Sequence, residues 1–133
     1  MNTENNMDLL SKMIILATIK HSGQVCKGGQ PYILHPLAVM NQVVSIDAKI
    51  VAVSHDLLED TDTTIDDLRT QGCSEQIIQA VVALTKSKNE SRIDSAHRVS
   101  NNRLACEVKL ADVAHNMDLS RLSTITDKDL KRV

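Results

Sequence analysis

Apolar residues recur every three or four positions along most of this chain, which is the spacing of one face of an α-helix. The stripe over residues 7–20 contains Leu9, Leu10, Met13, Ile14, Leu16 and Ala17. A second stripe over residues 74–84 contains Ile77, Ile78, Val81, Val82 and Leu84. No two-residue alternation bounded by hairpin signals interrupts this pattern. The sequence therefore predicts an all-α fold.

Turn-forming residues separate the first three predicted helices. Gly23 and Pro31 predict a loop after the first helix, and Pro36 suits the first turn of the second. Asp47 is the expected N-cap of the third helix, which we expect to continue without a break over residues 47–60.

The later helices also have recognisable boundaries. Thr64 and Asp67 predict a capping box for a short helix that ends at Gly72, and Ser74 predicts the N-cap of the helix after it. The remaining pattern predicts helices over residues 90–99 and 104–116, and a short final turn from Thr126.

Composition limits the function classes. A chain of 133 residues is long enough for one domain, and 42% hydrophobic with 24% charged residues is ordinary for a globular protein. Tyr32 is the only Phe, Tyr or Trp residue, so the core must be aliphatic. A platform of stacked rings for single-stranded nucleic acid is thereby disfavoured. The net charge of −2 also disfavours a binder of phosphate backbones.

Localisation signals are absent from the sequence pattern. Cys26, Cys73 and Cys106 are an odd number of thiols without CxxC spacing, which is typical of reduced cysteines in a cytoplasm. The N-terminus has no basic segment, and the apolar run over residues 13–17 is too short to cross a bilayer. We therefore expect a soluble cytoplasmic protein with no membrane or nucleic-acid partner, in an oligomeric state that the residues do not reveal.

The His55-Asp56 doublet is the strongest chemical signal. Glu59 and Asp60 follow one helical turn later, so that His55 lies above Glu59 and Asp56 above Asp60. The preceding apolar run over residues 50–53 predicts burial, and buried carboxylates beside an imidazole are best explained by a cation. The alternative is an exposed acidic helix end that contains one histidine.

His35 and Asp112 are further candidate ligands. Asp112 is a lone carboxylate in the apolar run VKLADVAHNM, and Asn116 lies one turn further on. A mixed set of imidazoles and carboxylates suits Mn²⁺, Fe²⁺ or Zn²⁺ better than Ca²⁺. A metal of this kind activates water, so the residues indicate a hydrolase.

The other histidines have different interpretations. His97 is expected at the surface, and His115 follows the apolar spacing expected of a hydrogen-bonded core histidine. His21 lies at a helix C-terminus, where an imidazolium is favourable, and beside the Gly-rich turn. A purely structural role and a substrate contact both remain open for His21.

Four runs occur in a specific order along the chain: HSGQVCKGGQPYILHPLAVM, VAVSHDLLEDT, LTK and VKLADVAHNMDLSRL. Together they resemble the HD-domain hydrolases of the alarmone (p)ppGpp, which include the hydrolase half of the Rel/SpoT enzymes and the stand-alone small alarmone hydrolases. The resemblance covers residues 16–122. It implies one HD-type helical domain over residues 1–133, Mn²⁺ as the cofactor, and removal of the 3′-pyrophosphate to give GDP or GTP.

The resemblance also implies roles for individual residues. His35, His55, Asp56 and Asp112 match the metal ligands, and Glu59 and Asp60 match the acidic pair that orients or deprotonates the attacking water. The side chains expected to contact the nucleotide substrate are Lys27, Lys86 and Arg121 at the phosphates, Asn116 of the HNM run, His21 and Tyr32.

Two features depart from the family pattern. Cys26 stands where the long bifunctional enzymes usually carry Arg, and the chain stops at Val133 where relatives continue with a helix near the purine. Stacking on guanine must then come from Tyr32, from an arginine, or not at all. Two alternatives therefore stay open: an HD phosphohydrolase of another nucleotide, such as an adenosine alarmone or a phosphorylated dinucleotide cofactor, and a non-catalytic nucleotide-sensing module.

Overall fold

A computed structural model describes residues 3–26 and 28–129, and the side chains of residues 6–26 and 28–117. These residues are all-α, as predicted, apart from an isolated antiparallel bridge between Val25 and Pro31. The helices are α1 (Thr3–Lys20), α2 (Leu34–Gln42), α3 (Ile46–Ser54), α4 (Leu57–Asp60), α5 (Ile65–Gln71), α6 (Glu75–Leu84), α7 (Arg92–Ser100) and α8 (Arg103–Asp129).

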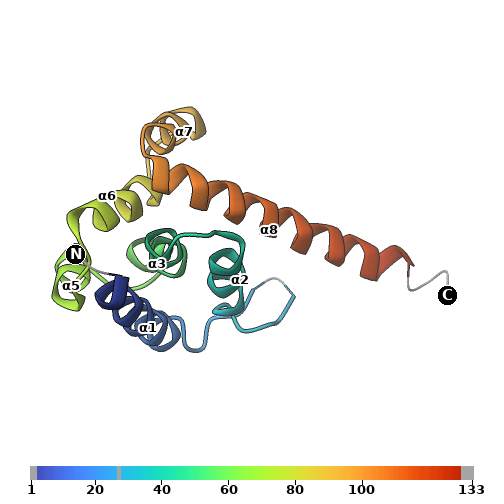
Figure 1. Cartoon of the computed structure of the whole chain (residues 1–133). Coiled ribbons are helices and arrows are strands. Elements are labelled where there is room, and N and C mark those ends of the chain that lie inside the picture. The colour runs from blue at the N-terminus through green and yellow to red at the C-terminus, as the bar shows by residue number, and fades with distance from the viewer. Residues whose placement is uncertain (1–2, 27, 130–133) are drawn as a thin grey trace.

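Helix α3 is the centre of the fold. It packs against α1, α2, α6 and α8, which surround it in Figure 1. Ala48 and the consecutive residues Ile50, Val51, Ala52, Val53 and Ser54 are buried. Because α3 is covered by four helices, its C-terminal end is fixed relative to α2 and α8. The His55-Asp56 doublet begins at that end.

The core around α3 is aliphatic, as the composition requires. Its largest fully buried side chains include Met13 of α1, Ile50 of α3, Ile77 and Ile78 of α6, and Val108 of α8. Burial of such side chains contributes about 1.5–3 kcal/mol each relative to exposure. The amphipathic stripes seen in the sequence are therefore the surfaces that hold the helices together.

Local capping signals around α5 are confirmed. The Thr64 hydroxyl accepts a hydrogen bond from the Asp67 N–H, and the Asp67 carboxylate accepts one from the Thr64 N–H. Gly72 closes the helix with φ of 107°, a left-handed conformation that favours glycine. Ser74 caps α6 as predicted, since its hydroxyl accepts from the Ile77 N–H.

Two predicted boundaries around α3 are wrong. Ser45, not Asp47, is the N-cap, because the Ser45 hydroxyl accepts from the Ala48 N–H. The expected continuous helix over residues 47–60 is also interrupted, since α3 ends at Ser54 and α4 begins at Leu57. Asp56, at φ −100° and ψ −2°, lies between the two helices. The break thus falls on the HD doublet itself.

Helix α8 is longer than predicted. It continues from Arg103 to Asp129, so the separate turn expected at Thr126 is not formed. The physical reason is that residues 103–129 contain neither Gly nor Pro to end a helix. In Figure 1, α8 crosses α3 and α2 and then extends past them. Neither α8 nor any other helix of the described residues is long and apolar enough to cross a membrane.

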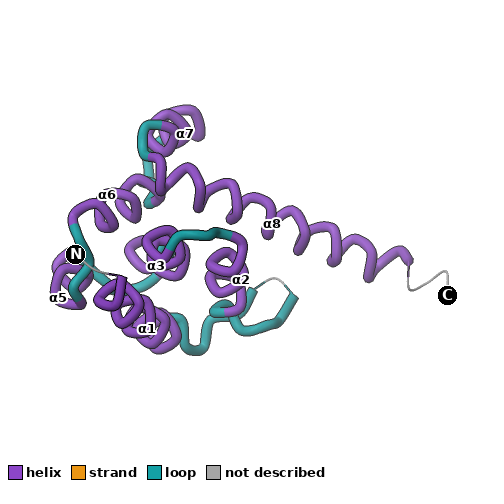
Figure 2. The backbone as a smooth tube through the Cα atoms, viewed as in Figure 1, coloured by secondary structure: helices purple, strands orange, loops and turns teal. Residues whose placement is uncertain are grey.

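A structured loop connects α1 to α2 (Figure 2). It folds back on itself, because the Cys26 N–H donates to the Gln30 carbonyl and the Tyr32 N–H donates to the Gln24 carbonyl. Gly29, at φ 84°, makes the turn. This folding brings Tyr32 to the N-terminal end of α2. Lys27, a predicted substrate contact in this loop, lies outside the described residues.

We expect Ile50→Ala to destabilise the protein by about 2–5 kcal/mol, because Ile50 is fully buried in the central helix and the substitution leaves a cavity. Chemical denaturation followed by circular dichroism measures the change. Val44→Ala is the control, since Val44 is 87% exposed and the change there should stay within about 0.5 kcal/mol. Equal effects of the two substitutions would contradict the central position of α3.

Candidate metal centre

Three helical segments converge on one cluster of imidazoles and carboxylates. His35 lies in the first turn of α2, His55 and Asp56 join α3 to α4, and Asp112 lies on α8. Asp112 is buried one helical turn after Val108, so the apolar face of α8 turns its carboxylate toward α3. The cluster is thus assembled by packing of α2 and α8 against the central helix.

The side chains of this cluster lie within ligand distance of one another. His35, His55 and Asp56 each offer one ligand atom, and these atoms all lie within 4.8 Å of one another. Oδ1 of Asp112 lies 2.8 Å from Nε2 of His35 and 3.4 Å from Nε2 of His55. The structure therefore brings together all four side chains predicted as metal ligands.

The chemistry of the cluster fits a divalent cation. Nε2 of His55 is buried and makes no hydrogen bond, although it lies 3.2 Å from Oδ2 of Asp56 and 3.4 Å from Oδ1 of Asp112. A buried polar nitrogen without a hydrogen bond is costly in a folded protein. A cation bound between the imidazoles and carboxylates would satisfy all of these atoms at once.

The pKa values of His55 and Asp112 are shifted because the imidazoles and carboxylates of the cluster lie close together. Burial alone would lower the pKa of His55, but the neighbouring carboxylates of Asp112 and Asp56 outweigh it and raise the pKa to about 8. Burial would raise the pKa of Asp112, but its contacts with His35 and His55 hold that pKa well below its usual range. The carboxylate of Asp112 is therefore ionised and available to a cation.

Groups outside the cluster orient its side chains. Nδ1 of His55 lies 2.6 Å from the Ala52 carbonyl, to which it donates, so Nε2 is the nitrogen that would bind a metal. The Tyr32 hydroxyl donates a hydrogen bond to Oδ2 of Asp56. Burial and the charge of Asp56 raise the pKa of Tyr32, so the phenol keeps its proton and remains a donor.

Tyr32, expected to contact the substrate, lies at the edge of this cluster. Its ring is half-buried between His21 and His35, with ring centroids 4.9 Å and 5.8 Å away. Its hydroxyl contact with Asp56 gives it a second role that the sequence did not suggest. The predicted contact with the nucleotide base stays a prediction.

The predicted acidic pair lies beside the cluster and faces solvent. Glu59 and Asp60 are exposed residues of α4, and Oε1 of Glu59 accepts a hydrogen bond from the Lys86 N–H at 2.9 Å. The pKa of Asp60 is raised, first by partial burial and then by the charges of Asp56 and Glu59. Such a carboxylate exchanges protons more readily near neutral pH.

His21 is buried at the end of α1, close to this acidic pair. Its Nδ1 lies 2.9 Å from Oε1 of Gln24, whose amide nitrogen donates to the Asp60 carbonyl. Its Nε2 is buried without a hydrogen bond. Gln24, which the sequence analysis did not single out, therefore links His21 to α4. The predicted substrate contact of His21 stays a prediction.

The other predicted substrate contacts have different positions. Asn116 is exposed on α8 and its amide lies 3.4 Å from Oδ1 of Asp112, so it borders the cluster. Lys86 is exposed in the loop after α6, and its backbone contacts Glu59. Arg121 belongs to α8, but its side chain lies outside the described residues. His97 is exposed on α7, as expected.

His115 is hydrogen-bonded, as the sequence predicts, but it is less deeply buried than expected. It was expected in the core, but it is only partly buried and its Nδ1 lies 2.7 Å from Nδ1 of His35. Its position one turn after Asp112 on the same helix face was the available signal.

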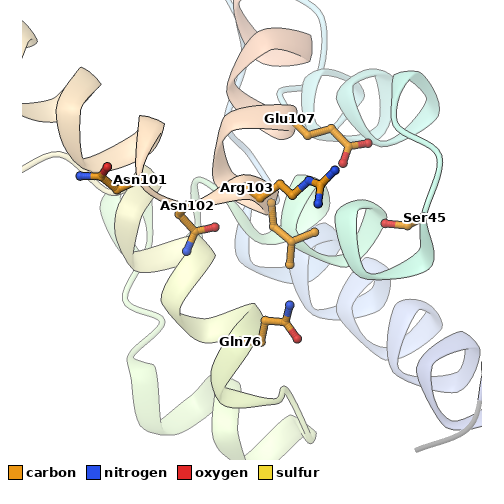
Figure 3. Close-up of a pocket in the computed structure, with 7 residues that line it drawn as sticks. Ser45, Gln76, Asn101, Asn102, Arg103 and Glu107 are labelled. Carbon is orange, nitrogen blue, oxygen red and sulfur yellow. The ribbon is translucent and has the colours of Figure 1, made fainter.

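A separate surface cleft of about 450 Å³ lies away from the cluster (Figure 3). It lies where α6 and the α7–α8 junction approach the N-cap of α3. Its lining is mostly polar and contains no histidine or group of carboxylates: Ser45, Gln76, Asn101, Asn102, Arg103, Leu104 and Glu107. Among the described residues, the group of imidazoles and carboxylates that could hold a metal is the cluster and not this cleft.

Curated relatives share sequence with most of this chain. A guanosine-3′,5′-bis(diphosphate) 3′-pyrophosphohydrolase of Haemophilus influenzae is 34% identical over 119 residues, covering 77% of this chain and 17% of the relative. The bifunctional (p)ppGpp synthase/hydrolase SpoT of Escherichia coli K12 is 30% identical over 129 residues, covering 86% of this chain and 18% of the relative. The chain thus spans less than a fifth of the length of these relatives.

A solved structure shows the same fold. It is a metazoan ortholog of SpoT that hydrolyses ppGpp, with a TM-score of 0.67 and 20% identity, covering 78% of this chain and 65% of the other. No family model matches the chain. The fold and the cluster define an all-helical HD-domain protein with a candidate metal centre. With the sequence relatives, they show that this chain is similar to the Rel/SpoT HD-domain proteins.

We expect Mn²⁺ to raise the melting temperature of the metal-free protein, because it binds the folded cluster and not the unfolded chain. An excess of 100-fold over Kd stabilises by about 2.7 kcal/mol, which corresponds to roughly 10 °C for a domain of this size. Asp112→Asn should reduce the shift, since it removes a buried charge that lies within 3.4 Å of both imidazoles. Differential scanning calorimetry measures both.

The matched control is Asp8→Asn, which removes an exposed carboxylate of α1. It should leave the manganese-dependent shift unchanged. A shift in Asp112→Asn as large as that of the unmodified protein would exclude Asp112 as a ligand.

Proposed function

We propose that this chain is a metal-dependent hydrolase that removes the 3′-pyrophosphate from (p)ppGpp, giving GDP or GTP and pyrophosphate. The observation that carries the proposal is the buried cluster of His35, His55, Asp56 and Asp112, with an exposed acidic pair beside it. The relatives named as 3′-pyrophosphohydrolases support the choice of substrate.

The cluster would hold the metal, which we propose to be Mn²⁺. His35, His55, Asp56 and Asp112 are the proposed ligands, and their mixed nitrogen and oxygen atoms suit this ion. When bound, the metal supplies Lewis-acid polarisation of a phosphate oxygen and lowers the pKa of water.

The acidic pair would act in proton transfer during hydrolysis. A water oxygen forms a bond to the phosphorus attached to the ribose 3′ oxygen, and the bond between that phosphorus and the 3′ oxygen breaks. The 3′ oxygen takes up a proton, and pyrophosphate leaves. Glu59 and Asp60 are the exposed carboxylates nearest the cluster on α4, so they are the proposed acceptors of the water proton.

Side chains around the cluster would bind the nucleotide. Lys86 lies in the loop whose backbone contacts Glu59, so a phosphate held by its ammonium would lie beside the proposed base. Asn116 borders the cluster from α8 and is the proposed ribose or phosphate contact. Lys27 and Arg121 are proposed for the same electrostatic role on the sequence motifs alone.

The cluster also favours hydrolysis over synthesis as the activity of this chain. One relative is named for both synthesis and hydrolysis. A cluster of two imidazoles and two carboxylates around an unbonded buried nitrogen suits activation of water at a metal.

A second candidate substrate is another 3′-phosphorylated nucleotide, such as an adenosine alarmone. It stays open because of the position of Tyr32, the only Phe, Tyr or Trp residue of the chain. Its half-buried ring packs on histidines and its hydroxyl is engaged by Asp56. It is therefore not a freely exposed platform for guanine, so purine selectivity rests on other groups.

We expect metal-stripped protein to release GDP and pyrophosphate from ppGpp only after Mn²⁺ is added. Chromatography of the nucleotides, with a pyrophosphate assay in parallel, measures both products. The adenosine analogue ppApp, assayed under the same conditions, tests purine selectivity.

The outcomes separate the hypotheses. Manganese-dependent turnover of ppApp but not of ppGpp would favour the second candidate. Bound manganese with no turnover of either nucleotide would contradict the enzyme proposal and favour a nucleotide-sensing module.

We expect Glu59→Gln to lower turnover by about 10²–10⁴-fold with metal still bound, the usual effect of losing an acid–base group. The amide oxygen of glutamine can still accept the hydrogen bond from the Lys86 N–H, so the substitution removes charge but keeps the loop in place. Steady-state kinetics and a manganese-binding titration check this. Asp8→Asn serves as the control, and an unchanged turnover number in Glu59→Gln would exclude it as the base.

A further inference from the structure

His35 is held from both sides of its ring. Its Nε2 lies 2.8 Å from Oδ1 of Asp112, inside the cluster, and its Nδ1 lies 2.7 Å from Nδ1 of His115. The ring centroids of the two imidazoles lie 4.9 Å apart and the ring planes are inclined by 23°. His35 is 7% exposed, so water has little access to either nitrogen.

The contact between the two Nδ1 atoms restricts the tautomer of His35. A hydrogen bond between them needs one proton, carried by one of the rings. A histidine that binds a metal through Nε2 carries its proton on Nδ1 and usually donates it to a neighbouring acceptor. Nδ1 of His115 is placed to be that acceptor once a metal replaces the proton on Nε2 of His35. In this structure that Nε2 is hydrogen-bonded to the carboxylate of Asp112, at 2.8 Å.

We propose that His115 is a positioning residue of the metal centre, which fixes the orientation and tautomer of His35 by accepting a hydrogen bond from its Nδ1. This inference rests on the metal centre of the proposed function. It gives each imidazole of the cluster the same arrangement, because Nδ1 of His55 is likewise held, by the Ala52 carbonyl. His115 lies one turn from Asp112, so α8 supplies both a ligand and the support of a second ligand.

Substitutions that place an amide at different distances from the backbone test the proposal. The amide of His115→Asn lies close to the position of the native Nδ1, whereas the amide of His115→Gln reaches toward the position of Nε2. We expect His115→Ala and His115→Gln to weaken binding of Mn²⁺ by about 10–100-fold, the usual cost of losing such a support. The Asn variant should recover most of the affinity. His97→Ala, at an exposed histidine of α7, is the matched control.

Manganese affinity is measured on metal-stripped protein by isothermal titration calorimetry, without substrate. Thermal unfolding of each metal-free variant checks that the fold is retained. The contrast between Asn and Gln, two side chains of similar polarity, keeps the test valid even if the Ala variant is poorly folded.

The outcomes also separate this inference from the proposed function. Absence of manganese binding in the unmodified protein would overturn the metal centre itself. Normal binding in all three variants, or equal binding in Asn and Gln, would overturn the role of His115 while leaving the centre intact. Equal loss in Asn and Ala would likewise overturn the positioning role, because an acceptor at the position of Nδ1 would then not restore the affinity.

Discussion

The buried imidazole of His55 imposes the constraint on which the rest of the structure depends. Its Nε2 lies between the carboxylates of Asp56 and Asp112 without a hydrogen bond. Removing these charged groups from water is unfavourable unless a cation compensates for it. The aliphatic packing of α1, α6 and α8 around α3 supplies the opposing stabilisation. The same packing that folds the chain therefore holds a site that favours a metal.

The geometry of the site is well defined because its side chains lie on or beside helices rather than on long loops. His35 and Asp112 lie within α2 and α8, and the HD doublet adjoins the covered end of α3. Ligands on rigid elements with supported rotamers keep their geometry better than ligands on loops. The break in the helix at His55 and Asp56 helps to bring both side chains to the cluster. In an uninterrupted helix, adjacent side chains would point about 100° apart.

The sequence predicted those features that depend on local chemistry. The cap formed by Thr64 and Asp67 was predictable because its partners are three residues apart, and the HD doublet was predictable because adjacent polar residues interrupt an apolar run. The N-cap at Ser45 was missed because Asp47 has an equally suitable side chain. Contacts across long separations, such as that of Tyr32 with Asp56, leave no periodic signal in the sequence.

The proposed metal-holding and proton-handling groups depend on different parts of the fold. Helices α2, α3 and α8 position the ligands, whereas Glu59 is held through the Lys86 N–H. That loop is in turn fixed by Arg98 of α7, whose guanidinium donates to the carbonyls of Ala83 and Thr85. Helix α7 contributes no side chain to the cluster, but it is connected to the proposed base through this chain of hydrogen bonds. The proposed base therefore depends on α6 and α7 as well as on the HD doublet that directly precedes α4.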